Sequence, residues 1–393
     1  MFAKSQVVDN CFMAALQAAN LMANPIGGRL ILFQVAQTII KHPLLAPKAG
    51  NSADRTDLVN ATNPYFANTA SELAHSQITC DLFIFSHGGS RNQQGGAYKN
   101  LANLADLAKF SSGSLYYYPE YSARGHGMKF SNELYHCLTR RVAWEAVFRI
   151  RTSTGFSQIA SYGNIQIKNK TNDLILYPSV DLDRVVTYEL EKTDSNLAGQ
   201  GEDPNRAARR DTSHLYIQSA LLYSTSEGER RIRVHNIAVP LTNLKHLPYE
   251  HMDVTALVHF WSRIALRRQS TNLNFQVCRS TIEMYLTNLC RAFLKAQSTN
   301  LTKPQLPDQF QYLSMYVLGL LKLPVMSPYD PKTQKAMVTL EALDPMTFVR
   351  YSMNHMSPEE VLLMVNPWVM NIHDYNLSDQ EVPALEALDR SVL

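Results

Sequence analysis

The stretch LYIQSALLYSTSEGERRIRVHNIAVP, residues 215–240, decides how the middle of the chain folds. It contains two runs, 215–225 and 230–240, in which apolar and polar side chains alternate, and the polar segment 226–229 separates them. Alternation with a period of two is typical of strands that bury one face. A short turn between two such runs joins them as a hairpin. The stretch therefore predicts a pair of antiparallel strands.

The residues on the N-terminal side of this hairpin continue the same pattern. The run 144–152 alternates, a turn follows at 153–155, and the run 156–168 returns. Several hairpins in succession are typical of an antiparallel β-sandwich, which we expect over residues 142–247. The polar segment 191–211 has no apolar periodicity, so we interpret it as a long exposed loop or a disordered insertion.

The first 141 residues have a different pattern, in which helices alternate with strands. Continuous apolar runs predict strands buried on both faces, whereas regularly spaced leucines and alanines predict helices. The alternation indicates an α/β fold with a parallel sheet. The expected strands are 29–36, 80–86 and 114–119, and the expected helices are 11–22 and 101–110.

Residues 248–376 are predicted to form a helical domain. Val254, Leu257, Val258, Trp261 and Ile264 form one apolar stripe at helical spacing, and 282–293 contains another. The run 311–323 is apolar nearly all round, which predicts a buried helix ending before Pro324. Ser357, Pro358 and Glu360 have the spacing of an N-cap, a first-turn proline and a capping-box glutamate.

Composition excludes several classes of protein. The 393 residues carry 37 Lys and Arg against 34 Asp and Glu, a net charge of +3, so no chain-wide positive field favours nucleic acid. The five cysteines form no C-x-x-C pair, which disfavours a disulfide framework and a cysteine-rich zinc site. The most apolar run, 315–323, is far shorter than the roughly 20 residues of a membrane-spanning helix. We therefore expect a cytosolic chain that can still lie on a membrane surface.

No catalytic residue set is recognisable, so we expect no enzyme. His87, Gly88 and Gly89 follow a strand, as in the oxyanion loop of an α/β-hydrolase, but the chain has no G-x-S-x-G motif. The twelve histidines are scattered without metal-ligand spacing. Asp181 and Asp183 are interpreted as an exposed turn. Together these features favour a binding or structural protein without a metal or cofactor.

Three arginines are the candidate binding residues. On a strand, Arg231 and Arg233 share one face, where two guanidinium groups could hold a carboxylate, and Arg230 lies on the other. The alternative is a solvated outer face, or pairing with Glu227 and Glu229. A second group allows the same two interpretations: Arg140, Arg141, Arg149 and Arg151.

The segment SALLYSTSEGERRIRVHNIAVPL (219–241) contains a G-E-R-R-I-R-V-H core. It is the most specific of several segments that resemble the cargo-adaptor subunit of the COPII coat, the Sec twenty-four family. LTRRVAWEAVFRIRTSTGFS (138–157) and YGNIQIKNKTNDLILYP (162–178) resemble the strands that precede it in that family. Further similar segments occur in the family's order along nearly the whole chain, at 27–36, 80–86, 112–119, 310–322 and 366–376.

The resemblance implies a non-enzymatic coat subunit in transport from the endoplasmic reticulum to the Golgi. Members of the family pair with a Sec twenty-three type subunit, meet a Sar-type GTPase through the coat, and capture cargo membrane proteins, including SNAREs. Such a protein lies peripherally on the cytoplasmic side of the endoplasmic reticulum membrane and on COPII vesicles. Arg230, Arg231 and Arg233 would then contact acidic cargo signals or a partner, and no nucleic acid would bind.

The resemblance also implies a division into domains, and the chain departs from the family pattern in two respects. We expect the C-terminal part of a von Willebrand A-type trunk at 1–141, the β-sandwich at 142–247, the helical domain at 248–376 and the start of a gelsolin-like domain at 377–393. The family's zinc finger and the first part of its trunk have no counterpart, so the chain resembles a fragment. The alternatives are the Sec twenty-three type partner subunit and, less favoured, an α/β-hydrolase.

Overall fold

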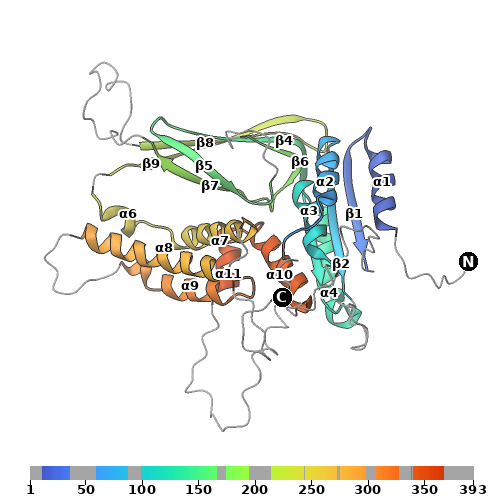
Figure 1. The fold of residues 1–393 in the computed structure, drawn as a ribbon. Coiled ribbons are helices and arrows are strands. Elements are labelled where there is room, and N and C mark those ends of the chain that lie inside the picture. Colours follow the sequence, from blue (N-terminus) through green and yellow to red (C-terminus); the bar gives the residue numbers. More distant parts are fainter. Residues whose placement is uncertain are drawn as a thin grey trace, which may run out of the picture.

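A computed structural model places three blocks of secondary structure against one another (Figure 1). It describes residues 11–35, 59–86, 99–165, 174–193, 214–242, 244–271, 275–297, 307–326, 338 and 340–366. An α/β block comes first along the chain, a β-sandwich follows, and helices complete the described part.

The α/β block is built on a three-stranded parallel sheet. Its strands β1 (Gly28–Gln34), β2 (Ile78–Phe85) and β3 (Leu115–Tyr118) lie in the order β1-β2-β3. Leu30 pairs with Cys80, and Leu82 pairs with Leu115. The parallel sheet that the apolar runs predict is therefore present. Four helices accompany it: α1 (Phe12–Ala23), α2 (Tyr65–His75), α3 (Leu101–Phe110) and α4 (Ala123–Thr139).

The prediction of burial on both faces holds for β2 and fails for β1. Every residue of β2 is buried except the half-buried Phe85. Strand β1 is mostly half-buried, and the side chain of Phe33 is 52% exposed. β1 is an edge strand and β2 is flanked on both sides, although β3, at the other edge, is mostly buried. An apolar run does not distinguish the two positions.

The β-sandwich consists of a four-stranded and a two-stranded antiparallel sheet. The larger has the order β6-β4-β8-β9, and the smaller pairs β5 with β7. Inward side chains from both sheets form its core, including Ala146, Ile175, Tyr177 and Tyr188. The strand bounds are β4 Val142–Thr152, β5 Phe156–Tyr162, β6 Leu174–Asp181, β7 Thr187–Lys192, β8 His214–Ser224 and β9 Arg230–Pro240.

One predicted hairpin of the sandwich is confirmed and the other is wrong. β8 and β9 pair along their full lengths, from His214–Pro240 to Ser224–Arg230. β4 does not pair with β5, because β4 lies between β6 and β8 and the chain crosses to the other sheet at 153–155. Gly155, with φ of 95°, occupies the left-handed region that this crossing requires. Alternation identifies a strand without identifying its neighbour.

Several predicted loops fall wholly or partly outside the described residues. Glu191 and Lys192, at the start of the expected loop 191–211, belong to β7 instead. The remainder of that loop from 194 onward, the glycine-rich stretch 87–96 and the expected start of a gelsolin-like domain at 377–393 lie outside the described residues.

The third block is helical and has its own apolar core. Both predicted stripes contribute, with Val258, Trp261, Ile282 and Phe293 buried. The capping box at the start of α11 is confirmed: Ser357 Oγ accepts from Glu360 N at 3.2 Å, and Glu360 Oε2 accepts from Ser357 N at 2.7 Å. The helices are α6 Leu247–Glu250, α7 Val254–Thr271, α8 Phe275–Ala296, α9 Leu313–Lys322, α10 Leu340–Met353 and α11 Pro358–Val365, with a 3-10 turn at Asp308–Phe310.

The predicted apolar helix is less buried than its composition suggests. α9 ends at Lys322, before Pro324 as expected, and it buries Leu313, Val317 and Leu320. Leu318 lies on the opposite side and is 50% exposed. None of the helices in the described segments is long and apolar enough to cross a bilayer.

Helix α10 ties the three blocks together. The carboxylate of Asp344 accepts hydrogen bonds from the backbone N–H groups of Lys99 and Leu101, at the start of α3. The Tyr351 hydroxyl donates to Gly113 O at 2.7 Å, and Asn164 Nδ2 donates to Tyr351 O at 3.2 Å. One helix thus contacts both the α/β block and the sandwich through buried polar groups.

Candidate binding surface

The three candidate arginines lie on β9, the edge strand of the larger sheet. All eleven residues of β9 are exposed, so the described residues cover neither of its faces. An edge strand has backbone N–H and C=O groups on its outer side that no neighbouring strand occupies. β9 is therefore the most open part of the sandwich.

The cross-strand register assigns the arginines to different faces. Arg231 lies opposite Tyr223 and Arg233 opposite Leu221, and both of these β8 residues pack into the sandwich core. Arg231 and Arg233 therefore extend the inner face, whereas Arg230 lies on the outer face opposite Ser224. The shared face of Arg231 and Arg233 agrees with the prediction from alternation. The three arginines therefore do not form a single cluster.

Arg230 is held by its neighbours on the outer face. Its Nη1 atom lies 3.1 Å from Glu145 Oε2 and 2.7 Å from Ser224 Oγ. Glu145 lies at an irregularity of β4, where the register shifts between Trp144 and Val147 and Glu145 has φ of 48°. No sequence signal links Glu145 with Arg230, because 85 residues separate them.

Arg231 and Arg233 differ in their freedom to bind a partner. Arg231 pairs with Glu229, with Nε to Oε2 at 2.9 Å, as one of the alternatives from the sequence proposed. Both side chains are more than half exposed. Arg233 makes no ion pair with any residue in the described segments. A carboxylate from outside can therefore reach Arg233 directly and can compete with Glu229 for Arg231.

Apolar side chains continue the inner face of β9 beyond the arginines. Ile237 is 57% and Val239 is 40% exposed, and both have the same parity along the strand as Arg231 and Arg233. In the described residues the second sheet has two strands, and its Tyr188 packs on Phe148 of β4. We call the residues Arg231, Arg233, Ile237 and Val239 the β9 strip. It combines positive charge, apolar surface and an open strand edge.

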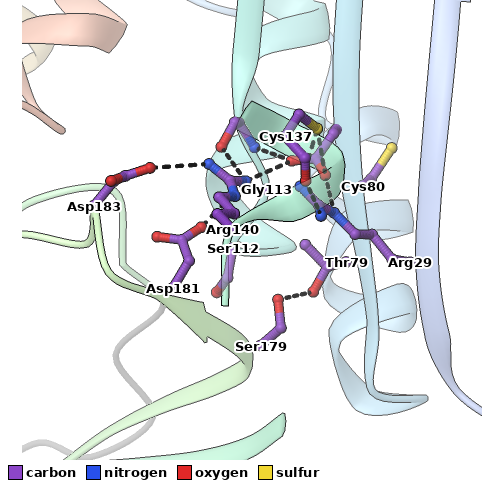
Figure 2. A network of polar contacts seen from close by, with 12 residues as sticks. Arg29, Thr79, Cys80, Ser112, Gly113, Cys137, Arg140, Ser179, Asp181 and Asp183 are labelled. Carbon is purple, nitrogen blue, oxygen red and sulfur yellow. Dashed lines mark hydrogen bonds and ion pairs between the residues drawn. The ribbon is translucent and has the colours of Figure 1, made fainter. Parts of the chain in front are cut away.

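A buried charge network fixes the sandwich against the α/β block (Figure 2). Its centre is Arg140, which caps the C-terminal end of α4 and precedes β4. The Arg140 side chain is only 4% exposed and lies 3.1 Å from Asp181, 3.4 Å from Asp183 and 3.6 Å from Asp81. Two of these carboxylates come from the end of β6 and the turn after it, and the third comes from β2.

Further bonds complete the network on both sides. Arg29 pairs with Asp81 and donates to Cys137 O at 2.6 Å. Asp81 Oδ1 accepts from Ser114 N at 2.7 Å. Thr79 and Ser179 share a buried hydrogen bond of 2.7 Å between their hydroxyls, directly joining β2 to β6 (Figure 2). The network therefore determines where the sandwich, and with it β9, lies.

The interpretation of Asp181 and Asp183 as an exposed turn was wrong for Asp181. Its side chain is 6% exposed and lies between Arg140 and Arg184. Asp183 is more open, at 39%, and contacts His136 Nε2 at 2.6 Å. Burial alone would raise the pKa of Asp183, but His136 and Arg140 together hold it below its ordinary value. Both carboxylates thus have partners 40 or more residues away in the sequence.

The remaining arrangement offers no metal chemistry in the described segments. No group of three or more His, Cys, Asp or Glu side chains there could hold a metal ion. The five cysteines are free thiols, and Cys80, Cys137 and Cys278 are buried. Burial raises the pKa of the Cys80 thiol well above its ordinary value, with Asp81 adding to the effect.

Comparison with known proteins identifies two domains of one family. The Sec23/Sec24 trunk domain matches residues 1–138, and the Sec23/Sec24 beta-sandwich domain matches residues 143–242. The chain is 31% identical over 340 residues to protein transport protein SEC24 of Dictyostelium discoideum, covering 81% of this chain and 30% of that protein. It is 29% identical over 330 residues to protein transport protein SEC24 A of Arabidopsis thaliana, covering 82% and 29%.

A solved structure has the same fold. The human COPII-coat protein Sec24c superposes with a TM-score of 0.76 at 23% identity, covering 93% of this chain and 45% of that one. The similarity therefore extends over the α/β block, the sandwich and helices. The chain spans about three tenths of the length of the curated relatives above.

Proposed function

Because the chain belongs to the Sec23/Sec24 family, we propose that it acts as a Sec24-type subunit of the COPII coat that binds export cargo. Its relatives are named as protein transport proteins, and the human structure is that of a COPII-coat protein. Membership of this coat family agrees with the prediction of a non-enzymatic protein. It leaves the α/β-hydrolase alternative without support.

The proposed partners are those of a coat subunit. They are a Sec23-type subunit, a Sar-type GTPase met through that subunit, and cargo membrane proteins, including SNAREs. The protein would lie peripherally on the endoplasmic reticulum membrane and on COPII vesicles. Weak contacts with cargo suffice there, because coat and cargo on one membrane surface bind with a high effective concentration.

The observation that carries the cargo proposal is the β9 strip. Arg233 has no ion pair with a described residue, and Arg231 pairs with the exposed Glu229. An acidic peptide can lie along an open edge, form backbone hydrogen bonds with it, and place a carboxylate on a guanidinium group. Arg230 contributes less to this contact, because Glu145 and Ser224 already hold it.

Charge reversal tests the cargo contact. Arg233→Glu, alone and with Arg231→Glu, should weaken the binding of a fluorescent acidic export-signal peptide by at least about tenfold, since it replaces attraction with repulsion. Arg291→Glu is the matched control, because Arg291 is exposed on α8, far along the chain from β9. Equal affinity for all of these variants would remove the β9 strip as the cargo site.

Complex formation tests the coat assignment separately. The purified chain, mixed with a Sec23-type subunit, should elute with it as one species in size-exclusion chromatography. The β9 variants should elute in the same way if the strip serves cargo and not the partner. Separate elution of the chain and its Sec23-type partner at micromolar concentrations would contradict the coat role for this chain.

A further inference from the structure

A cavity of about 470 Å³ lies where the three blocks meet. Its walls come from α3 in the α/β block, from the end of β5 and the residues after it in the sandwich, and from α7 and α10 in the helical block. Cavities of this size are large enough for a small organic molecule. The β9 strip does not contribute to it, so the cavity is separate from the proposed cargo contact.

The cavity wall is strongly basic. Lys109, Arg263, Arg267 and Arg350 line it, and Asp106 is the single carboxylate among its lining residues. Among the described residues of the wall, the excess is therefore three positive charges. This contrasts with the chain as a whole, whose net charge is +3 over 393 residues.

Arg263 is the most unusual of these cations, because it is fully buried without a carboxylate partner. Its relative exposure is 0%, and its bonds go to Met356 O at 2.8 Å, His259 Nε2 at 3.1 Å and Asn354 Oδ1 at 3.4 Å. All three acceptors are formally neutral, since burial and the Arg263 charge lower the pKa of His259 to about 4. Burial lowers the pKa of Arg263 itself to about 9. A buried cation without an anion is costly for a fold.

Arg350 and Lys109 are two further, partly buried cations of the cavity wall, and Asp106 acts on both. Arg350 donates to Val59 O at 2.7 Å and to Asn60 Oδ1 at 2.9 Å, which are again neutral acceptors. Burial lowers the pKa of Arg350 to about 10, although Asp106 opposes the shift. Burial also lowers the pKa of Lys109. Clusters of charged groups perturbed in this way within a cavity are typical of ligand sites.

Arg267 is the cation on the solvent-exposed part of the cavity wall, and it stacks on an aromatic ring. Arg267 is exposed, and its guanidinium carbon lies 5.3 Å from the centre of the Tyr162 ring. Stacking on an aromatic ring restricts the orientation of a guanidinium group. Ser161 and Thr347, also in the wall, each have a buried hydroxyl without a hydrogen-bond partner in the described segments.

We propose that this cavity binds a small molecule carrying at least two phosphate groups. Arginine forks bind phosphate oxygens through paired hydrogen bonds, and a multiply charged anion would neutralise the excess of three positive charges. The small volume of the cavity favours such a ligand over an acidic peptide, whose carboxylates are spread along an extended chain. The ligand comes either from solution, as a free phosphorylated sugar, or from a membrane, as a phosphoinositide headgroup.

Binding to the full 393-residue chain tests the proposal with two probes. Inositol 1,4,5-trisphosphate is titrated calorimetrically as the soluble probe. Flotation with phosphatidylcholine vesicles, with and without phosphatidylinositol 4,5-bisphosphate, supplies the membrane arm. Binding of the soluble probe without flotation on phosphoinositide vesicles supports a free ligand, and flotation that requires the phosphoinositide supports a headgroup.

Neighbouring arginines provide matched variants. Arg267→Gln should weaken binding about tenfold, whereas Arg268→Gln should leave it unchanged, because Arg268 binds Thr281 and stacks on Tyr285 instead. Lys109→Met should also weaken binding about tenfold. Burial already disfavours the charge of Lys109, so we expect this variant to fold. Melting temperatures of all three variants verify that each one is folded.

Three results would overturn the proposal. The first is that neither probe binds at millimolar concentration. The second is equal loss of binding in the Arg267 and Arg268 variants, which would indicate general surface charge. The third is tighter binding of a hexa-aspartate peptide than of inositol trisphosphate, which would make the cavity a peptide site. None of these results depends on whether a Sec23-type subunit binds, so the coat assignment is tested independently.

Discussion

Replacing Arg140 should destabilise the protein more than any change on its surface. In Arg140→Met the side chain keeps its length and loses its charge, inside a site where Arg140 is 4% and Asp181 is 6% exposed. Asp81 retains Arg29, but Asp181 retains only Arg184, at 3.9 Å. Removing one partner of a buried pair costs about 3–5 kcal/mol, because it leaves an uncompensated charge. Because Asp181 keeps its contact with Arg184, we expect Arg140→Met to lose about 3 kcal/mol of the free energy of unfolding, near the lower end of this range.

The adjacent residue is the control. Arg141 is exposed and makes no ion pair with a described residue, so Arg141→Met should change the free energy of unfolding by no more than about 0.5 kcal/mol. Urea denaturation followed by circular dichroism measures both variants. Adding Asp181→Asn to Arg140→Met should recover at least about 1 kcal/mol, since the carboxylate left with only the 3.9 Å contact to Arg184 is then replaced by a neutral amide.

Two outcomes would refute this reasoning. If Arg140→Met lost less than about 1 kcal/mol, the network would contribute little to the junction between the α/β block and the sandwich. If the double variant were no more stable than Arg140→Met, the loss would arise from packing and not from the charge of Asp181.

Three further predictions concern a glycine, a thiol and a histidine. Gly113→Ala should lower the free energy of unfolding by more than about 3 kcal/mol, because the added Cβ would lie 1.8 Å from Cys80 O. Gly127→Ala, where the Cβ would meet open space on α4, should raise it by about 0.5–1 kcal/mol, and denaturation measures both variants. At pH 8 a thiol reagent should label the exposed Cys11 of the native protein and leave Cys80 unlabelled, because Cys80 is buried and its pKa is raised. Mass spectrometry of the peptides measures the labelling of each thiol. Burial, and then the charge of Arg263, lower the pKa of His259 to about 4, so between about pH 6.5 and 4 the unfolded chain takes up a proton that the folded chain excludes. The free energy of unfolding should therefore fall as the pH is lowered through this window, by up to about 1.4 kcal/mol per pH unit from this group, and His259→Gln should flatten the slope.

Much of the fold follows from patterns within short segments. The apolar run of β2, the leucine spacing of α3 and the alternation along 215–240 each identify their element. The capping box at Ser357 and Glu360 is predicted by a motif of four residues and is formed in the structure. These features depend on the backbone geometry of neighbouring residues, which the local sequence determines.

The candidate site could be predicted only in part. Alternation correctly assigns Arg231 and Arg233 to one face, and proximity in sequence suggests the contact between Arg231 and Glu229. It does not reveal that β9 is an edge strand, because that depends on which strands pair. It also does not reveal that Arg230 is held by Glu145, which an irregularity in another strand brings close.

The sequence by itself determined the order of the blocks, the type of each element and, through its segments, the family. Only the tertiary structure decided that the chain passes from β4 to the other sheet, that Asp181 is buried against Arg140, and that Arg263 lies in the wall of a basic cavity without a carboxylate partner. The physical reason is the range of the interactions. Periodicity and capping act over a few residues, whereas strand pairing, buried charge and cavities depend on distances between residues that are tens to hundreds of positions apart in the chain.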